Sequence, residues 1–239
     1  MKRLLSHAAL FTALAGSAFG SVTFLSAPNS VLDTVNWGNI GGDGTLFSDG
    51  QTVTSGLGNV TTINLGTQPG LGGLTSVVCA PSPSGCSWPN QPSGFSAGDT
   101  LIWLEGLDTN SNPVGTGPLT LTLANSVFGL GAYIQATSAG AFTATLALYN
   151  GGTLLGSQSY SSDGAGDPLF LGGADTIKDI TKAVFTVTAC GSFGCDVNDF
   201  AVDTVDILAA TPEPATFGLS GMVLAVGFAV RKRLQRGNK

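Results

Sequence analysis

Residues 142–149, Phe-Thr-Ala-Thr-Leu-Ala-Leu-Tyr, alternate apolar side chains with mostly polar ones and lead directly into Asn150-Gly151-Gly152. A period of two is typical of a strand with one buried face. Asn-Gly favours a tight hairpin turn, because both residues tolerate positive φ. Thr153 to Tyr160 then runs back, so this stretch predicts an antiparallel β-hairpin.

The same period extends outward along the chain. It is clear at Leu119-Thr120-Leu121-Thr122-Leu123, and no amphipathic helical stretch of convincing length appears between residues 21 and 210. Further strands are expected at 127–135, 183–189 and 200–208, with looser ones around Val31, Val53, 60–65 and 101–104. Segment 38–73 is rich in Gly, Asn and Thr, and we expect loops or irregular edge strands there to the same degree as regular sheet.

Many short strands between turn clusters predict an all-β fold. An antiparallel sheet with one polar face must bury its other face, most simply against a second sheet. We therefore expect residues 21–210 to form one antiparallel β-sandwich, with a jelly roll as the specific arrangement. No internal repeat is evident, which argues against a solenoid or propeller.

Charge is unevenly distributed along the 239 residues. Between residues 21 and 210 only Lys178 and Lys182 are basic, against fourteen acidic residues. Nucleic-acid binding needs Lys and Arg to neutralise phosphates. Nucleic acid is therefore excluded as a partner.

The N-terminus has the pattern of a secretory signal peptide. Met1-Lys2-Arg3 precedes a short apolar run and then small residues up to Gly20. We expect residues 1–20 to be removed by cleavage after Gly20, with Ala18 as the second choice. A permanent membrane helix is the alternative, but the apolar run is shorter than the ~20 residues that span a bilayer.

The C-terminus combines an uncharged apolar run with a basic tail. Residues 215–230 carry no charge, and Arg231-Lys232-Arg233 follows at once in the tail 231–239. Sixteen residues in a helix reach about 24 Å, enough for a marginal single transmembrane helix with snorkelling basic side chains. The positive-inside rule then keeps the tail in the cytoplasm and the preceding domain outside. A buried core helix is the alternative.

Thr211-Pro212-Glu213-Pro214-Ala215-Thr216, the apolar run and the basic cluster together resemble the PEP-CTERM sorting signal of exported bacterial proteins. The resemblance covers about residues 211–236. It implies recognition of segment 211–239 by an exosortase, a membrane-embedded processing enzyme, and delivery to the cell surface or an exopolysaccharide matrix. The two prolines would hold Glu213 in an extended segment outside the bilayer.

A second resemblance concerns the domain itself. The segments 128–133, 142–145, 154–156 and 200–203 are similar to jelly-roll ectodomains that often accompany this signal and look like carbohydrate-binding modules. The resemblance covers about 80 residues and contains no catalytic motif. It implies a surface domain with sugar as a possible ligand.

Four cysteines, Cys79, Cys86, Cys190 and Cys195, follow the signal peptide and should therefore meet an oxidising compartment. Three connectivities are possible. We favour Cys79–Cys86 and Cys190–Cys195, because each pair brackets a short turn-forming loop. A zinc site of four thiolates is the rival, although the six residues between Cys79 and Cys86 exceed the usual ligand spacing.

Enzymatic chemistry is mostly excluded by what is missing. The single histidine, His7, lies in the signal peptide, which removes Ser-His-Asp, Cys-His and histidine-metal sites from the mature domain. Glu105 is the single glutamate in 21–210, and no pair of acids stands out as a glycosidase site. We expect no catalytic residues and no enzyme.

Asp196, Asn198, Asp199 and Asp203 are candidate ligands for a structural calcium ion, because Ca²⁺ takes carboxylate and carbonyl oxygens. Asp203 enters by resemblance to a calcium-holding Asp in the last strand of jelly-roll modules. The alternative is solvated surface acids. No other cofactor is expected.

Three tryptophans, Trp37, Trp88 and Trp103, could stack on sugar rings. Trp103 lies among apolar residues and is better explained by core packing. Trp88, in a Pro-rich loop, is the candidate sugar contact.

These observations predict an exported cell-surface or matrix protein with a non-enzymatic structural or adhesive role. The alternative is a carbohydrate-binding module of the exopolysaccharide matrix, and a polysaccharide hydrolase is the third hypothesis. Partners would be an exosortase, the membrane and exopolysaccharide.

Overall fold

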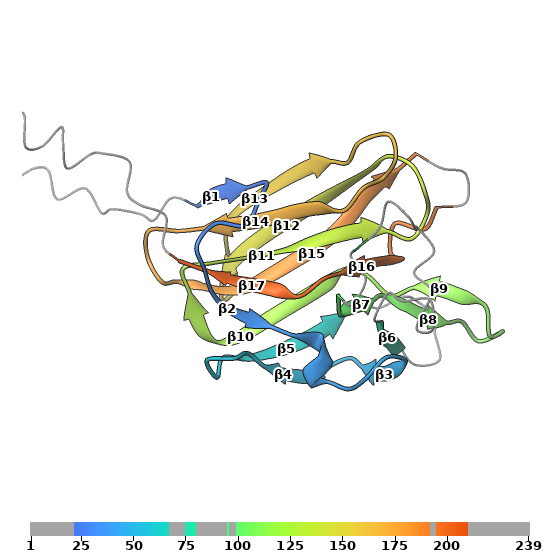
Figure 1. Ribbon diagram of the computed structural model, residues 1–239, viewed down its shortest axis with the longest axis horizontal. Coiled ribbons are helices and arrows are strands. Elements are labelled where there is room, and N and C mark those ends of the chain that lie inside the picture. The colour runs from blue at the N-terminus through green and yellow to red at the C-terminus, as the bar shows by residue number, and fades with distance from the viewer. Residues whose placement is uncertain (1–21, 67–74, 80–94, 96–98, 192–194, 210–239) are drawn as a thin grey trace, which may run out of the picture.

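The computed structural model describes residues 22–66, 75–79, 95, 99–191 and 195–209 (Figure 1). These residues form strands and one 3₁₀ turn, η1 (Trp37–Asn39). The strands are β1 (Thr23–Leu25), β2 (Val31–Val35), β3 (Thr45–Ser48), β4 (Thr52–Thr54), β5 (Val60–Leu65), β6 (Thr75–Cys79), β7 (Leu101–Trp103), β8 (Glu105–Leu107), β9 (Pro113–Gly115), β10 (Leu119–Val127), β11 (Gly129–Ala136), β12 (Phe142–Asn150), β13 (Thr153–Ser161), β14 (Leu169–Ala174), β15 (Ile180–Cys190), β16 (Phe200–Val202) and β17 (Val205–Leu208).

The strands form two main sheets in which the described pairings are all antiparallel. A nine-stranded sheet has the order β1-β14-β11-β16-β7-β6-β3, and β17 joins it between β11 and β2. A six-stranded sheet has the order β13-β12-β15-β10-β5-β4, and β8 and β9 form a separate hairpin. The prediction of an antiparallel all-β fold is confirmed.

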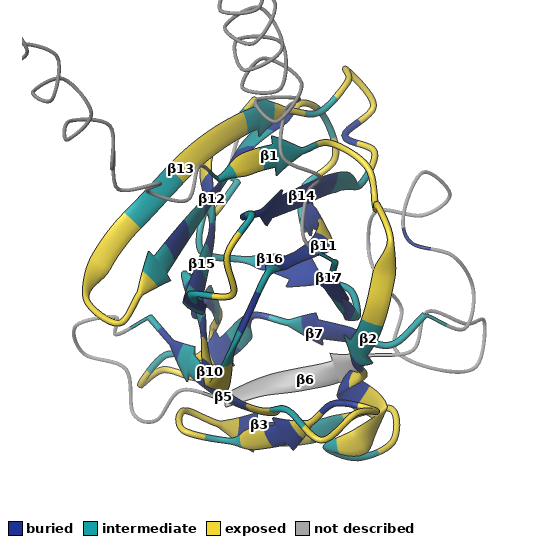
Figure 2. Cartoon of the chain, turned by 90° about the vertical axis from the view of Figure 1, so that its left-hand side faces the viewer, coloured by how far each residue is buried: buried dark blue, intermediate teal, exposed yellow. Residues whose placement is uncertain are grey.

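One hydrophobic core lies between the two sheets, as the burial colours of Figure 2 indicate. On the six-stranded sheet, β12 turns alternate side chains inward, namely Phe142, Ala144, Leu146 and Leu148. On the nine-stranded sheet, β11 does the same with Leu130, Ala132, Ile134 and Ala136. Both sets belong to the same buried cluster. The period of two in the sequence therefore arises because alternate side chains of both sheets point into one core.

The central hairpin has the expected boundaries. β12 and β13 pair from Thr143 opposite Ser161 to Asn150 opposite Thr153, with an irregularity between Leu148 and Tyr149. Gly151 turns the chain at φ +55°, in the left-handed region that glycine adopts without strain. The turn chemistry of Asn-Gly-Gly therefore fixes this hairpin.

β14 is a strand that sequence patterning did not reveal. It is buried along most of its length, because β1 and β11 flank it and both of its faces are covered. The ring of Phe170 packs edge-on against Tyr133, with centroids 5.3 Å apart. A Cβ on Gly131 or Gly172 would lie 2.5 Å from that ring, so both positions require glycine.

The last predicted strand, 200–208, divides into β16 and β17. Both pair with β11, but Ile134 faces Val202 whereas Gly131 faces Asp206, so one extra residue is accommodated between them. The irregularity at Asp203 and Thr204 is a bulge of the kind that bends a strand and re-aims its side chains. It places Asp203 beside η1, where Trp37 Nε1 donates to the Asp203 carbonyl.

The predicted signal peptide (1–20) and C-terminal segment (211–239, with its helix at 215–230) lie outside the described residues. Within the part of the chain that the structure describes, no helix is long and apolar enough to cross a membrane.

Candidate functional site

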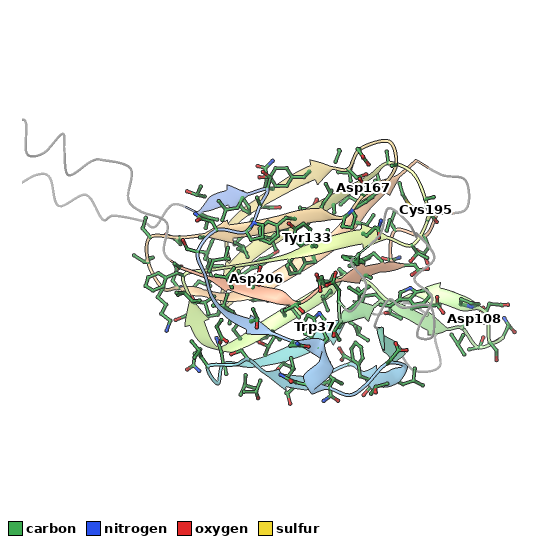
Figure 3. All side chains as sticks on the ribbon, in the orientation of Figure 1. Trp37, Asp108, Tyr133, Asp167, Cys195 and Asp206 are labelled. Carbon is green, nitrogen blue, oxygen red and sulfur yellow. A yellow bond between two sulfur atoms is a disulfide. The ribbon has the colours of Figure 1, made fainter. Side chains whose placement is uncertain are left out.

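Three candidate calcium ligands, Asp196, Asn198 and Asp199, lie in the segment that joins β15 to β16, and the fourth, Asp203, lies between β16 and β17. A disulfide between Cys190 and Cys195, with Cα atoms 6.2 Å apart, closes the first part of this segment, which is the pairing favoured above. Cys79 ends β6 and Cys86 lies outside the described residues, so their pairing stays a prediction. In Figure 3, Cys195 lies at the same end of the molecule as Asp108 and Asp167.

The segment 196–199 is held against the chain before β10. One carboxylate oxygen of Asp196 accepts from the Gly115 amide at 2.9 Å, and the other accepts from the Asn198 amide at 2.9 Å. The Asn198 carbonyl accepts from the Gly117 amide at 2.9 Å. A Cβ on Gly115 would lie 2.2 Å from the Asn198 carbonyl carbon, so the two backbones are in direct contact. The oxygens of Asp196 thus serve to fix the loop.

Asp199 is largely enclosed and has two side-chain donors. Its Oδ1 accepts from Trp103 Nε1 at 2.8 Å and from the Thr137 hydroxyl. Burial raises the pKa of Asp199, the two hydrogen bonds partly oppose this effect, and the charge of Asp196 adds to it. A carboxylate that already accepts two hydrogen bonds in a dry environment acts as a structural acceptor.

Glu105, at the start of β8, is a neighbour of Asp199 that sequence reasoning missed. Burial raises the pKa of Glu105, and the negative charge of Asp199 raises it further. The two acids are far apart in sequence, and the one usable signal was that Glu105 is the single glutamate of the domain. They are a pair of carboxyl groups with raised pKa values, which is the feature to examine for acid–base chemistry.

Asp203 belongs to a different acidic group. Its Oδ1 accepts from the Thr204 amide at 2.6 Å. Burial raises the pKa of Asp203 to about 6, and the charges of Asp99 and Asp206 contribute to the increase. The acids whose charges act on Asp203 are therefore not those that act on Asp199.

The four candidate calcium ligands consequently do not form the single site that the sequence suggested. Asp196 and Asp199 use their carboxylates on the protein's own donors, and the acids whose charges act on Asp203 are Asp99 and Asp206. Among the described residues there is no group of three or more His, Cys, Asp or Glu side chains placed to hold a metal ion.

The tryptophans do not form a shared platform for sugar. Trp37 is fully buried, and its Nε1 donates to the carbonyls of Val202 and Asp203 at 3.1 and 3.0 Å. A sugar-stacking role for Trp37 is therefore wrong. Trp103 packs against the small buried cluster of Phe95, Leu101 and Ala201, as the core-packing interpretation expects. Trp88 lies outside the described residues.

A hollow of about 310 Å³ opens at the opposite end of the molecule, where Leu208 ends β17. Its lining is largely apolar and includes Leu32, Leu57, Phe128, Lys178 and Leu208. Asp33 also lines it, but its carboxylate accepts from the Ser55 hydroxyl and from the amides of Thr34 and Leu57. The hollow offers mainly apolar surface, and its polar lining consists of Asp33, which is engaged in hydrogen bonds, Lys178, Asn59 and Asn125.

Comparison with protein families identifies the sorting segment. Residues 210–233 fit the family model of the PEP-CTERM protein-sorting motif, a range that includes the expected motif residues Pro212, Glu213, Pro214, Arg231, Lys232 and Arg233. No curated protein matches the chain. The chain is therefore a β-domain followed, one residue after its last described strand, by a PEP-CTERM sorting motif.

Proposed function

We propose that this chain is a non-enzymatic surface or matrix protein whose jelly-roll-like β-sandwich is the cargo of an exosortase-dependent sorting signal. The observation that carries the proposal is the junction between the two parts. β17 is held between β11 and β2 and ends at Leu208, and the matched motif begins at residue 210. Because the folded domain ends where the sorting motif begins, the motif can direct the intact domain to its destination.

The geometry of the acids supports a structural role over catalysis. Asp33, Asp196 and Asp199 each accept hydrogen bonds from at least two groups of the protein. A general acid or base needs an oxygen that can reach a substrate. The Glu105–Asp199 pair is the remaining candidate for a hydrolase, and turnover of polysaccharide substrates would reveal it.

Membrane attachment in this proposal comes from the C-terminal segment. The apolar run 215–230 spans the bilayer while the basic tail stays inside, until the exosortase acts near Glu213. The signal peptide at 1–20 starts export. The final location is the cell surface or the surrounding polysaccharide matrix.

Cell fractionation tests the proposal. We expect the intact chain to reach the envelope or matrix, and a chain lacking Pro212 to Lys239 to enter the medium instead. A triple variant, with Pro212, Glu213 and Pro214 all changed to Ala, keeps the helix and tail and separates recognition from anchoring. It should remain in the inner membrane unprocessed. An unchanged distribution of both variants would refute the sorting role.

Carbohydrate binding is a second candidate function, favoured by one observation. The outer face of the six-stranded sheet carries rows of hydroxyl groups, such as Ser159, Thr145 and Thr186 on three adjacent strands. Thr143 and Ser161 share a hydrogen bond of 2.9 Å on the same face. Rows of hydroxyl groups can exchange hydrogen bonds with the hydroxyls of a glycan.

A glycan array with the intact chain and with Thr145→Val tests this function. Retention on polysaccharide that the valine variant loses would support it, and the absence of retention for the intact chain would exclude it. Thr109→Val, which changes an exposed threonine between β8 and β9, outside the six-stranded sheet, is the matched control.

A further inference from the structure

The end of the domain from which the chain leaves toward the sorting motif gathers several loops. We call it the exit end, and Figure 2 looks onto it. Here Leu208 ends β17, and the Ala209 amide donates to the Ser30 carbonyl. The β4–β5 loop (55–59), the β12–β13 turn (151–152) and the β14–β15 loop (175–179) reach the same end, where residues 57 and 178 line one hollow.

Apolar side chains are concentrated on this end. The described residues include nine large hydrophobic side chains that are exposed, and six of them lie at or next to the exit end: Val31, Leu32, Leu57, Val60, Leu154 and Ile177. Leu57, at the tip of the β4–β5 loop, is 78% exposed, and Leu32 beside it is 58% exposed. Together with the open hollow they make an apolar surface far richer than scattered single residues would.

The basic residues of the domain lie at the same end. Lys178 and Lys182 are the two basic residues of the whole span 21–210, one in the β14–β15 loop and the other two residues into β15. Lys182 Nζ lies 4.1 Å from the centroid of the Tyr149 ring. At the opposite end Figure 3 shows two acidic residues, Asp108 and Asp167.

Four acids also lie near the exit end. Asp206, two residues before Leu208, is half-buried in β17, and burial raises its pKa. Asp33 is bonded to Ser55 and Leu57, as described above. Asp175 is 1% exposed, and its carboxylate accepts from the amides of Thr176 and Ile177. Burial and the charge of Asp175 raise the pKa of Asp179. These acids are hydrogen-bonded or at least half-buried, and the two lysines are the basic groups that lie beside them.

The length of chain beyond Leu208 brings this end close to a bilayer. Six residues, 209–214, separate Leu208 from the apolar run that begins at 215. Fully extended, six residues span at most about 20 Å. This step rests on the membrane anchoring given under the proposed function.

We propose that the exit end docks on the lipid bilayer while the chain is anchored, with Leu32, Leu57 and Ile177 entering the interface and the two lysines facing anionic headgroups. An apolar surface with basic side chains beside it is the pattern of an interfacial membrane contact. Lysine stems add to it by covering apolar surface while the ammonium stays in water. The contact holds the domain against the membrane and fixes the distance of the motif from it.

Photo-crosslinking of the full chain in vesicles of phosphatidylcholine and phosphatidylglycerol tests the proposal. A benzophenone amino acid replaces Leu57 in one variant and Leu107 in the control. Leu107 is 50% exposed but lies in the β8–β9 hairpin, away from the exit end. We expect severalfold more crosslinking to lipid from position 57. Lys178→Gln should lower that yield by about fivefold, which corresponds to about 1 kcal/mol per basic residue at an anionic surface.

Flotation of the same vesicles separates the two proposals. If the chain floats but positions 57 and 107 label lipid equally weakly, the exit end does not dock, and the anchoring stands. Crosslinking of position 57 to a second copy of the chain would also overturn docking, in favour of self-association. A chain that does not float refutes the anchoring and, with it, the docking that depends on it.

Discussion

Replacing Asp203 with Asn should make the domain more stable at neutral pH. Asp203 lies at the bulge between β16 and β17, where burial and the charges of Asp99 and Asp206 raise its pKa from the ordinary 3.8 to about 6. Above that pH the folded domain holds a charge that is better solvated in the unfolded chain. Asn keeps the size of the side chain and an oxygen that can accept the 2.6 Å bond from Thr204.

The magnitude follows from the two pKa values of Asp203. A folded pKa above the unfolded one contributes stability that is fully present below about 3.8 and is lost as the pH rises through about 6. The difference corresponds to about 3 kcal/mol as an upper limit. Near pH 4 the variant and the natural chain should therefore have similar free energies of unfolding, and by about pH 8 the variant should be more stable by up to this amount.

Chemical denaturation of the purified chain in detergent, followed through the fluorescence of Trp37 and Trp103, measures these free energies. Acids that do not interact with Asp203 contribute equally to both proteins and cancel in the difference, whereas Asp206, whose charge acts on Asp203, adds a smaller change of its own. Asp167→Asn makes the same chemical change at an exposed position and is the control. If the two free energies differ by the same amount at every pH, the charge on Asp203 has no cost and the reasoning is wrong.

Two further predictions concern packing and the crosslink. Gly131→Ala should destabilise the domain by about 1–3 kcal/mol, because the added Cβ would overlap Phe170. Gly152→Ala, at an open position, should be nearly neutral in the same unfolding assay, and equal effects of the two changes would contradict the packing argument. Replacing Cys190 and Cys195 with Ser should cost about 2 kcal/mol, as expected for a short loop. Non-reducing peptide mapping should find these two cysteines linked to each other, and a peptide joining either of them to Cys79 would exclude that pairing.

Strands with one solvent-exposed face were predictable from the sequence, because the alternation of apolar and polar side chains indicates which face is buried. The hairpin of β12 and β13 is the clearest example: both strands begin at the predicted residue, and each ends one residue later than predicted. β14 was not predicted, because both of its faces are covered and its Leu-Phe-Leu therefore shows no alternation of apolar and polar side chains. Its Gly172-Gly173 looks like a turn, whereas in the structure these glycines admit the rings of Phe170 and Phe24.

The candidate site was less predictable, because its contacts join distant parts of the chain. Asp199 accepts a hydrogen bond from Trp103, which lies 96 residues away in the sequence. The sequence around either residue gives no sign of this contact. Trp37 was expected as a potential sugar contact, and its neighbours in the sequence, Asn and Gly, do not indicate burial. In the structure its side chain is fully buried in the core. The sorting motif was recognisable because its chemistry is contiguous: two prolines, an apolar run and a basic tail.

The position of the last two strands has a consequence for the order of events during export. β16 is the connection between β11 and β7, and β17 is the connection between β11 and β2. An emerging chain can form its hairpins early, but it cannot join the parts of the nine-stranded sheet until residue 208 has crossed the membrane. The sorting motif follows after a single residue. A chain whose motif has arrived at the processing enzyme is therefore the first that is able to finish folding.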